Sequence, residues 1–389
     1  MYIYLLPTEI IFAILQSVYY NGLFLYDHAA ITVLARTCRA FKEPALDLLW
    51  KDMWGFERLI SCLPEGVSKI TPEGWTLTRP LSPGEWNTVA RYSHRIRSLT
   101  INESNLGRID DRIVQALIST PSRAPLLPNL RSLEWWDERE RFLPLLHTLL
   151  VPTIRSMKLG CASHKPWAPS FTKSALLACL AARCPATREL VCAYTDDSHV
   201  ICEFICGWQE LFHLEMGDLN TQSLRHLASL PSLKSLCFKT SYSDGTQPYS
   251  TPIFFSRLDE VSITAPAPFL FNQCLKGVRF PSCRSVVSCV GEIEDSEFTY
   301  NFKEIPEPPY NLLNIPDLIS SLSTSFSHTL ERISINFFYL DIAGGLADPH
   351  LVLGFDAVTP LLSFNRLTEL DLNFFCTSAI DDSRLKIMA

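Results

Sequence analysis

The apolar positions at the start of the chain recur with the spacing of a helix. Pro7 is suited to a first helical turn because its φ is preset and it has no N–H to leave unpaired. Apolar residues then follow at three- and four-residue intervals, until Asn21-Gly22 interrupts the pattern. The spacing predicts a helix from Pro7 to about residue 20, with its buried face at Ile10, Ile11, Ile14, Leu15 and Val18.

Two further helices are predicted before residue 51. Asp27 can cap a helix that ends near Phe41, and Pro44 can open a third, shorter one. Three helices of this length are too few to close a core alone. Apolar surface is left over at four positions off the main stripes: Tyr19, Leu23, Ala30 and Val33. This surface is expected to bind a partner protein or to dock on the rest of the chain, and periodicity favours neither.

From residue 95 a different pattern recurs, in which apolar residues stand at the first, fourth and sixth positions of a short segment. Several neighbouring copies lie roughly 22 to 25 residues apart, as in leucine-rich repeats. The clearest copy is Leu130/Leu133/Trp135, and Cys283/Val286 is the most degenerate. The other copies are Ile96/Leu99/Ile101, Ile154/Met157/Leu159, Leu190/Cys192, Leu211/Leu214/Met216, Leu233/Leu236/Phe238, Leu258/Val261/Ile263, Leu330/Ile333/Ile335 and Leu367/Leu370/Leu372.

Helix candidates lie between these copies, at 172–183, 221–229, 317–325 and 356–363. A strand followed by a helix cannot bury its own apolar face, so such units must stack. The fold class is therefore predicted to be α/β, an irregular curved solenoid. The asparagine that forms a ladder in typical leucine-rich repeats is mostly missing, which argues against a regular horseshoe.

The segments that break these patterns are predicted to be connecting structure. Residues 55–94 form a connector rich in proline and glycine, in which Ser82-Pro83-Gly84-Glu85 predicts a helix start with a capping box. An acidic stretch at 291–297 and a proline-rich stretch at 305–310 are predicted to be solvated loops, with a binding loop as the alternative. The last residues, 381–389, read as the start of a helix without a capping repeat, and a truncated product is the hypothesis that follows.

The first fifty residues also resemble a known family. Leu6-Pro7-Thr8-Glu9-Ile10, the block Leu34 to Phe41 with Cys38-Arg39 inside it, and Glu43 to Trp50 together resemble an F-box. The resemblance is to the fungal group of F-box proteins with leucine-rich-repeat-like tails. It implies a three-helix F-box over residues 1–54, followed by the connector and a repeat solenoid over 95–389.

The resemblance implies a partner and a function. In the family the three-helix unit binds the Skp adaptor, which connects it to a cullin–RING scaffold. The residues that match the adaptor-binding or packing positions are Leu6, Pro7, Glu9, Ile10, Leu34, Cys38, Phe41 and Trp50, with Phe41 standing where many members have tryptophan. The implied function is a substrate-recognition adaptor of an SCF-type ubiquitin ligase, in which the solenoid binds the protein substrate.

Composition limits the remaining possibilities. Hydrophobic residues make up 47% of the 389 positions and charged residues 19%, which predicts a chain folded throughout. The net charge of −7 argues against a nucleic-acid partner. A cluster of Arg91, His94, Arg95 and Arg97 is interpreted as a solvated helix end. Residues 10–26 carry no charge, but polar residues interrupt them and no early basic residue precedes them, so neither a membrane span nor a signal peptide is predicted.

Neither the cysteines nor the known catalytic motifs indicate a reactive site in this sequence. Thirteen cysteines are spread along the chain, often at apolar positions, which favours reduced thiols and a cytoplasmic or nuclear location. Neither a phosphate-binding glycine motif, a nucleophile elbow nor a zinc-binding HExxH helix is present. A metal site from His199, Cys202, Cys206 and His213 has the wrong spacing for structural zinc.

No cofactor is therefore predicted, and the protein is expected to be non-catalytic. Two alternatives stay open at this point. One is an interaction scaffold without a role in ubiquitin transfer. The other, more remote, is a hydrolase or metal enzyme within the repeats.

Overall fold

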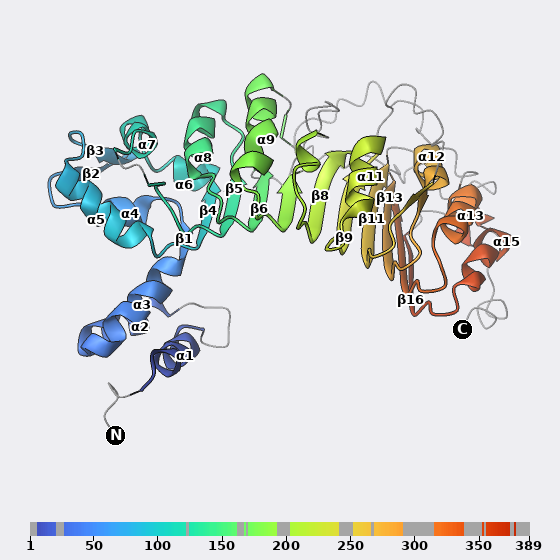
Figure 1. Ribbon diagram of the computed structural model, residues 1–389, viewed down its shortest axis with the longest axis horizontal. Coiled ribbons are helices and arrows are strands. Elements are labelled where there is room, and N and C mark those ends of the chain that lie inside the picture. Colours follow the sequence, from blue (N-terminus) through green and yellow to red (C-terminus); the bar gives the residue numbers. More distant parts are fainter. Residues whose placement is uncertain are drawn as a thin grey trace. The chain divides into compact units, whose positions relative to one another are not determined.

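The computed structural model describes residues 6–20, 27–121, 124–161, 167–168, 170–192, 203–240, 252–265, 268–290, 315–337, 352–353, 355–373 and 377–378 (Figure 1). The chain divides into two compact units. Unit 1 comprises Met1–His164 with Ala182–Ala186, and unit 2 comprises Lys165–Ala181 with Thr187–Ala389. Each unit is described by itself.

Unit 1 begins with three helices: α1 (Thr8–Tyr19), α2 (His28–Thr37) and α3 (Arg39–Lys51). The side chain of Asp27 accepts a hydrogen bond from the Ala30 N–H at 2.8 Å, which confirms the predicted cap of α2. The predicted end of α2 and start of α3 were wrong. Cys38 has an extended backbone that ends α2, so α3 begins at Arg39 and contains Phe41, while Pro44 lies inside it.

The three helices share a core of their own, which we call the helical cluster. Its buried side chains come only from α1, α2 and α3: Ile11, Leu15, Tyr19, Ile31, Phe41, Ala45 and Leu48. The predicted buried face of α1 is therefore too wide, because Ile10 and Ile14 are exposed while Tyr19, expected at the surface, is buried. Because α2 and α3 cover only part of the circumference of α1, the residues of α1 that face the core are Ile11, Leu15 and Tyr19.

A short strand, β1 (Asp52–Trp54), comes at the end of the range predicted for the F-box. The predicted connector contains short, regular elements: α4 (Glu57–Ser61), the antiparallel hairpin of β2 (Ser68–Thr71) with β3 (Gly74–Leu77), and α5 (Pro83–Ser93). The helix start predicted at Ser82 is confirmed. The Ser82 N–H donates to Glu85 Oε2 at 2.6 Å, and the Glu85 N–H donates to Ser82 Oγ at 3.4 Å. The two bonds form the capping box that the four-residue motif indicates.

Parallel strands make up the rest of unit 1. β4 (Ser98–Asn102) pairs with β1 and with β5 (Ser132–Trp136), and β5 pairs with β6 (Ser156–Gly160). Between the strands lie α6 (Glu103–Leu106), α7 (Asp111–Ile118), the 3-10 helix η2 (Glu140–Phe142) and α8 (Leu143–Leu149). The helices α7 and α8 lie on one side of these strands (Figure 1). The register aligns the buried residues Met53, Leu99, Leu133 and Met157 across the four strands.

Unit 2 repeats the arrangement. Its parallel strands, in the order in which they pair, are β7 (Glu189–Cys192), β8 (His213–Asp218), β9 (Ser235–Lys239), β11 (Glu260–Ala265), β13 (Ser285–Val290), β14 (Arg332–Phe337) and β16 (Glu369–Asn373). Their register aligns Leu190, Leu214, Leu236, Val261, Val286, Ile333 and Leu370. These seven strands are therefore stacked in the order in which they occur along the chain, as repeats require.

Most of α9 (Phe171–Arg183) belongs to unit 2 and comes before β7. The helices between the later strands are α11 (Thr221–Ser229), α12 (Pro268–Gly277), α13 (Ile315–Ser325), α15 (Phe355–Val358) and the 3-10 helix η5 (Thr359–Ser363). Two small parallel pairs accompany them, β10 (Ile253–Phe254) with β12 (Val278–Arg279) and β15 (Val352–Leu353) with β17 (Thr377–Ser378). The four predicted helix segments are confirmed, although the last is divided between α15 and η5. The mixed α/β class and the stacked strands are thus confirmed, the degenerate copy at Cys283/Val286 included.

Hydroxyl groups partly replace the missing asparagine ladder. Thr153 Oγ1 donates to the Leu130 carbonyl of the preceding repeat at 2.7 Å, and Ser232 Oγ donates to the Leu211 carbonyl at 2.7 Å. Thr329 Oγ1 donates in the same way to the Cys283 carbonyl at 3.0 Å. Each of these side chains stands in the turn before a strand, so it satisfies a carbonyl between adjacent turns that would otherwise lack a partner.

Some expectations fall on residues outside this description: the acidic stretch at 291–297, the proline-rich stretch at 305–310 and the segment 381–389. Within the described ranges, every helix is too short or too polar to cross a lipid bilayer. Burial raises the pKa of Cys192 to about 12 and that of Cys237 to about 11, so these thiols stay protonated at neutral pH.

Candidate protein-interaction surface

The helical cluster presents a line of exposed apolar side chains along α1. Pro7, Ile10 and Ile14 stand three and four residues apart and therefore lie on the same side of the helix. Ile10 is 48% exposed and Ile14 is 40% exposed, whereas the neighbouring Ile11 and Leu15 are buried. We call Pro7, Ile10 and Ile14 the α1 stripe. It is apolar surface that the described part of this chain leaves uncovered.

The first turn of α1 has no side-chain cap. Pro7 occupies the N-cap position with an extended backbone and makes no side-chain cap, and its carbonyl accepts from the Ile10 and Ile11 N–H groups at 3.0 and 3.1 Å. Glu9 lies exposed in the first turn, where the helix dipole favours an anion. The exposed set Pro7, Glu9 and Ile10 therefore combines apolar and acidic groups at one helix start.

The other residues named by the family resemblance lie deeper. Leu6, Leu34 and Cys38 are half-buried and pack against the helical cluster, and Phe41 is a buried member of its core. Trp50 is half-buried and stacks on Tyr92 of α5, with ring centroids 4.6 Å apart. These five residues serve the packing within unit 1, and of the eight only Pro7, Glu9 and Ile10 are exposed.

The helical pattern placed both isoleucines of the α1 stripe on the buried face, and only Ile10 was also named as a site residue through the family resemblance. Ile14 belongs to the same apolar run as Ile11 and Leu15, and its exposure depends on where α2 and α3 lie. Val33 was placed off the main stripe of its helix, and it is 61% exposed on α2. Of the four positions expected to leave apolar surface, Val33 is exposed, Ala30 is half-buried and Tyr19 is buried. Leu23 lies outside the described residues.

Charged groups join the helical cluster to the remainder of unit 1. The Arg95 guanidinium pairs with both Glu43 and Asp47 of α3, and it is only 11% exposed. The predicted solvated basic cluster is therefore only partly correct. Arg91 and His94 are exposed at the end of α5, but Arg95 is an ion-paired contact between α3 and the segment before β4.

The polar face of the unit 1 strands carries paired charges. Lys158 on β6 pairs with Glu134 on β5 at 2.8 Å, and Thr100 Oγ1 on β4 donates to Glu134 at 3.4 Å. Trp54 continues this row on β1 and is 68% exposed. The face thus combines an aromatic side chain with internally neutralised charge.

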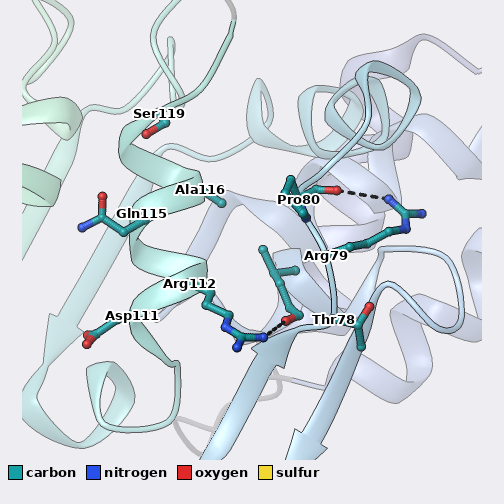
Figure 2. A pocket seen from close by; sticks show the side chains of 9 residues that line it. Thr78, Arg79, Pro80, Asp111, Arg112, Gln115, Ala116 and Ser119 are labelled. Atoms are coloured by element: carbon teal, nitrogen blue, oxygen red, sulfur yellow. Dashed lines mark hydrogen bonds between the residues drawn. The ribbon is translucent and has the colours of Figure 1, made fainter.

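A pocket of about 570 Å³ lies between the segment after β3 and one side of α7 (Figure 2). Its two arginines already have partners. Arg79 pairs with Glu85 at 2.6 Å and donates to the Pro80 carbonyl at 3.1 Å, and Arg112 donates to the Leu77 carbonyl at 3.3 Å. Arg79 is thus ion-paired and Arg112 is hydrogen-bonded to the backbone, and we assign the pocket no role.

The described residues also give no reactive constellation. They contain no group of three or more histidine, cysteine or acidic side chains close enough to hold a metal ion. Of the four residues considered for a metal site, His199 and Cys202 lie outside the described ranges, while Cys206 is half-buried and His213 begins β8. Among the described residues, the exposed apolar surface on α1 is therefore the clearest candidate for a functional site, and it suits contact with another protein.

Comparison with known proteins adds little to this picture. No model of a known protein family matches the sequence, and no curated protein matches it. Among solved structures, the leucine-rich repeat-containing protein LegL7 from Legionella pneumophila is similar, with 15% sequence identity and a TM-score of 0.31 over 79% of this chain and 94% of that chain. Because that overlap is loose, the repeat architecture rests on the strand order and register described above.

Proposed function

We propose that this protein is a substrate-recognition adaptor of an SCF-type ubiquitin ligase. The helical cluster would act as an F-box and bind a Skp-type adaptor, and the parallel-strand repeats would bind the protein to be ubiquitinated. The observation that carries the proposal is the α1 stripe, which begins at the proline of the Leu-Pro-x-Glu motif and stays exposed beside the packed core of the helical cluster.

Two further observations support this division of roles. The helical cluster has a separate core and is joined to the remainder of unit 1 by the ion pairs of Arg95 and the stack of Trp50 on Tyr92. Because the helical cluster is packed against the remainder of unit 1, a protein bound to the repeats would be held at a defined position relative to the adaptor. Such a component contributes proximity, since it raises the effective concentration of substrate at the ligase and supplies no reacting group.

The test is binding of a purified Skp-type adaptor to the full chain in a pull-down assay. The double substitution of Leu6 and Pro7 to alanine should abolish capture, because it changes the first turn at which the exposed surface begins. Leu6 also packs against the helical cluster, so thermal unfolding of the variant must be measured beside it. Capture that is unchanged in a folded variant would contradict the proposal.

A protein-interaction scaffold without ubiquitin transfer is the second candidate. The same exposed surface on α1 and the paired, polar strand face favour binding in either case. Reconstitution of the ligase separates the two: the first candidate requires that a bound substrate becomes ubiquitinated, and the second predicts adaptor binding without any such product.

A further inference from the structure

Arg58 contacts two helices of the helical cluster from outside it. It lies on α4, which follows the cluster along the chain. Its Nη1 group donates to the Leu49 carbonyl in the last turn of α3 at 3.4 Å. Its Nη2 group lies 3.3 Å from Nε2 of His28, the first residue of α2. We call these two contacts the Arg58 bridge. It joins α2 and α3 to α4 within unit 1.

The contact with His28 requires one protonation state of that ring. A guanidinium group has N–H donors and no acceptor, and it stays charged at every physiological pH. Nε2 of His28 must therefore accept the hydrogen bond, which requires a neutral ring with its proton on Nδ1. An imidazolium donates from both nitrogens, so a protonated His28 would lose this bond and would also be repelled by the charge of Arg58.

The groups around His28 favour the neutral ring on balance. Burial and the charge of Arg58 lower the pKa of His28 from its ordinary 6.5, and the charge of Asp27 opposes this shift. The Asp27 carboxylate already accepts from the Ala30 N–H at 2.8 Å. The Tyr19 ring on α1 packs edge-on against the imidazole, with ring centroids 5.3 Å apart. A cation therefore faces His28 from α4, a carboxylate from the residue before α2, and an aromatic ring from α1.

Two other contacts described above join the cluster to the remainder of unit 1. They are the ion pairs of Arg95 and the stack of Trp50 on Tyr92, and neither includes a histidine. Histidine is the side chain whose ordinary pKa places its change of charge between about pH 5 and 8. Among these contacts, His28 is therefore the group through which a change of pH in that range reaches the joint.

We propose that the Arg58 bridge is a pH-sensitive contact, which forms while His28 is neutral and breaks when His28 is protonated. Its contribution is present above the ordinary histidine pKa of 6.5 and is lost as the pH falls from 6.5 through the lowered pKa of His28. Arg95 still holds α3 when the bridge breaks, and the core of the cluster is separate. Acidification therefore loosens α4 from α2 without unfolding the cluster. The inference does not rest on the proposed function, because it concerns contacts inside unit 1 alone.

The first test is an NMR titration of the histidine ring signals of the full chain between about pH 7.5 and pH 5, the range in which imidazole titrates. The His28 signal is assigned by its absence in the variant His28→Gln. The pKa of His28 should lie below 6.5 in the unaltered chain. It should rise in Arg58→Gln, because the repelling charge is removed. A His28 pKa that is the same in Arg58→Gln would overturn the proposal.

The second test measures opening of the bridge by hydrogen–deuterium exchange of backbone amides, detected by mass spectrometry. The reporters are the Ile60 and Leu63 N–H groups, which lie in and directly after α4 and donate to the Phe56 and Ile60 carbonyls at 3.0 and 3.1 Å. Each rate is divided by the intrinsic exchange rate at the same pH. The corrected exchange should be roughly threefold to tenfold faster at about pH 5.5 than at about pH 7.5, the factor that one hydrogen bond supplies.

The variant His28→Gln separates protonation of this ring from other effects of acid. The glutamine amide oxygen can accept from Arg58 at either pH, so corrected exchange should be equal at both. His94→Gln is the matched control, since His94 lies at the end of α5 with its Nδ1 3.1 Å from the Ala90 carbonyl of that helix. This variant should keep the pH dependence of the unaltered chain.

Three exchange results would overturn the proposal. One is corrected exchange at α4 that does not change with pH in the unaltered chain. Another is the same acceleration by acid in His28→Gln, and the third is loss of that acceleration in His94→Gln. No Skp-type adaptor is present in either assay, so failure of this proposal and failure of the ligase assignment are observed separately.

Discussion

The α1 stripe gives a quantitative prediction for adaptor binding. Full burial of an isoleucine side chain contributes about 1.5 to 3 kcal/mol. In the unbound chain, Ile10 is 48% exposed and Ile14 is 40% exposed. Contact with a partner can therefore bury a little less than half of each side chain, which corresponds to roughly 1 kcal/mol per residue.

The perturbation is the double substitution Ile10→Ala with Ile14→Ala. Both changes remove side-chain atoms from exposed positions, so the core at Ile11 and Leu15 stays intact and the variant should fold. The loss of roughly 2 kcal/mol in binding free energy corresponds to a dissociation constant about 30-fold higher. Isothermal titration calorimetry of the purified chain with a purified Skp-type adaptor measures this change directly.

Ile70→Ala supplies the matched control. Ile70 lies on the β2–β3 hairpin, is 69% exposed and belongs to the same unit, but it stands outside the helical cluster. Its substitution should leave the dissociation constant unchanged. The reasoning is refuted if the α1 double variant binds within about threefold of the unaltered chain, or if Ile70→Ala weakens binding to the same extent.

Two predictions concern the stability of unit 1. The hydrogen bonds from Arg79 and from the Ser82 N–H lower the pKa of Glu85 to about 2 from its ordinary 4.5, so the stability that this carboxylate contributes is present above pH 4.5 and is lost as the pH falls to 2. Glu85→Gln should therefore flatten the dependence of the melting temperature on pH in this interval. Thr153→Val removes the bond to the Leu130 carbonyl and should lower the free energy of unfolding in urea by about 1 kcal/mol.

Each of these has an outcome that would contradict it. A Glu85→Gln variant that loses stability between pH 4.5 and 2 as steeply as the unaltered chain would show that other carboxylates dominate the acid transition. For the turn before β6, Thr153→Ser should restore the stability that valine removes. Failure of serine to do so would assign the effect to packing of the methyl group.

Local patterns in the sequence determined most of the secondary structure. The signature with apolar residues at positions one, four and six predicts strands because its last two apolar residues lie on one side of an extended chain. Even the degenerate copy at Cys283/Val286 forms β13, since a buried thiol packs as a small hydrophobe. Likewise, the caps at Asp27 and Ser82 form as predicted because the groups that make them are only three residues apart.

Tertiary structure alone decided which of these residues face solvent. Ile10, Ile11, Ile14 and Leu15 have similar hydropathy, yet two are exposed and two are buried, because the positions of α2 and α3 choose the covered side of α1. The ion pairs of Arg95 were equally hidden in the sequence, since Asp47 and Glu43 lie 48 and 52 residues away along the chain. Composition and periodicity are properties of neighbours along the chain, whereas exposure and charge pairing depend on contacts between distant segments.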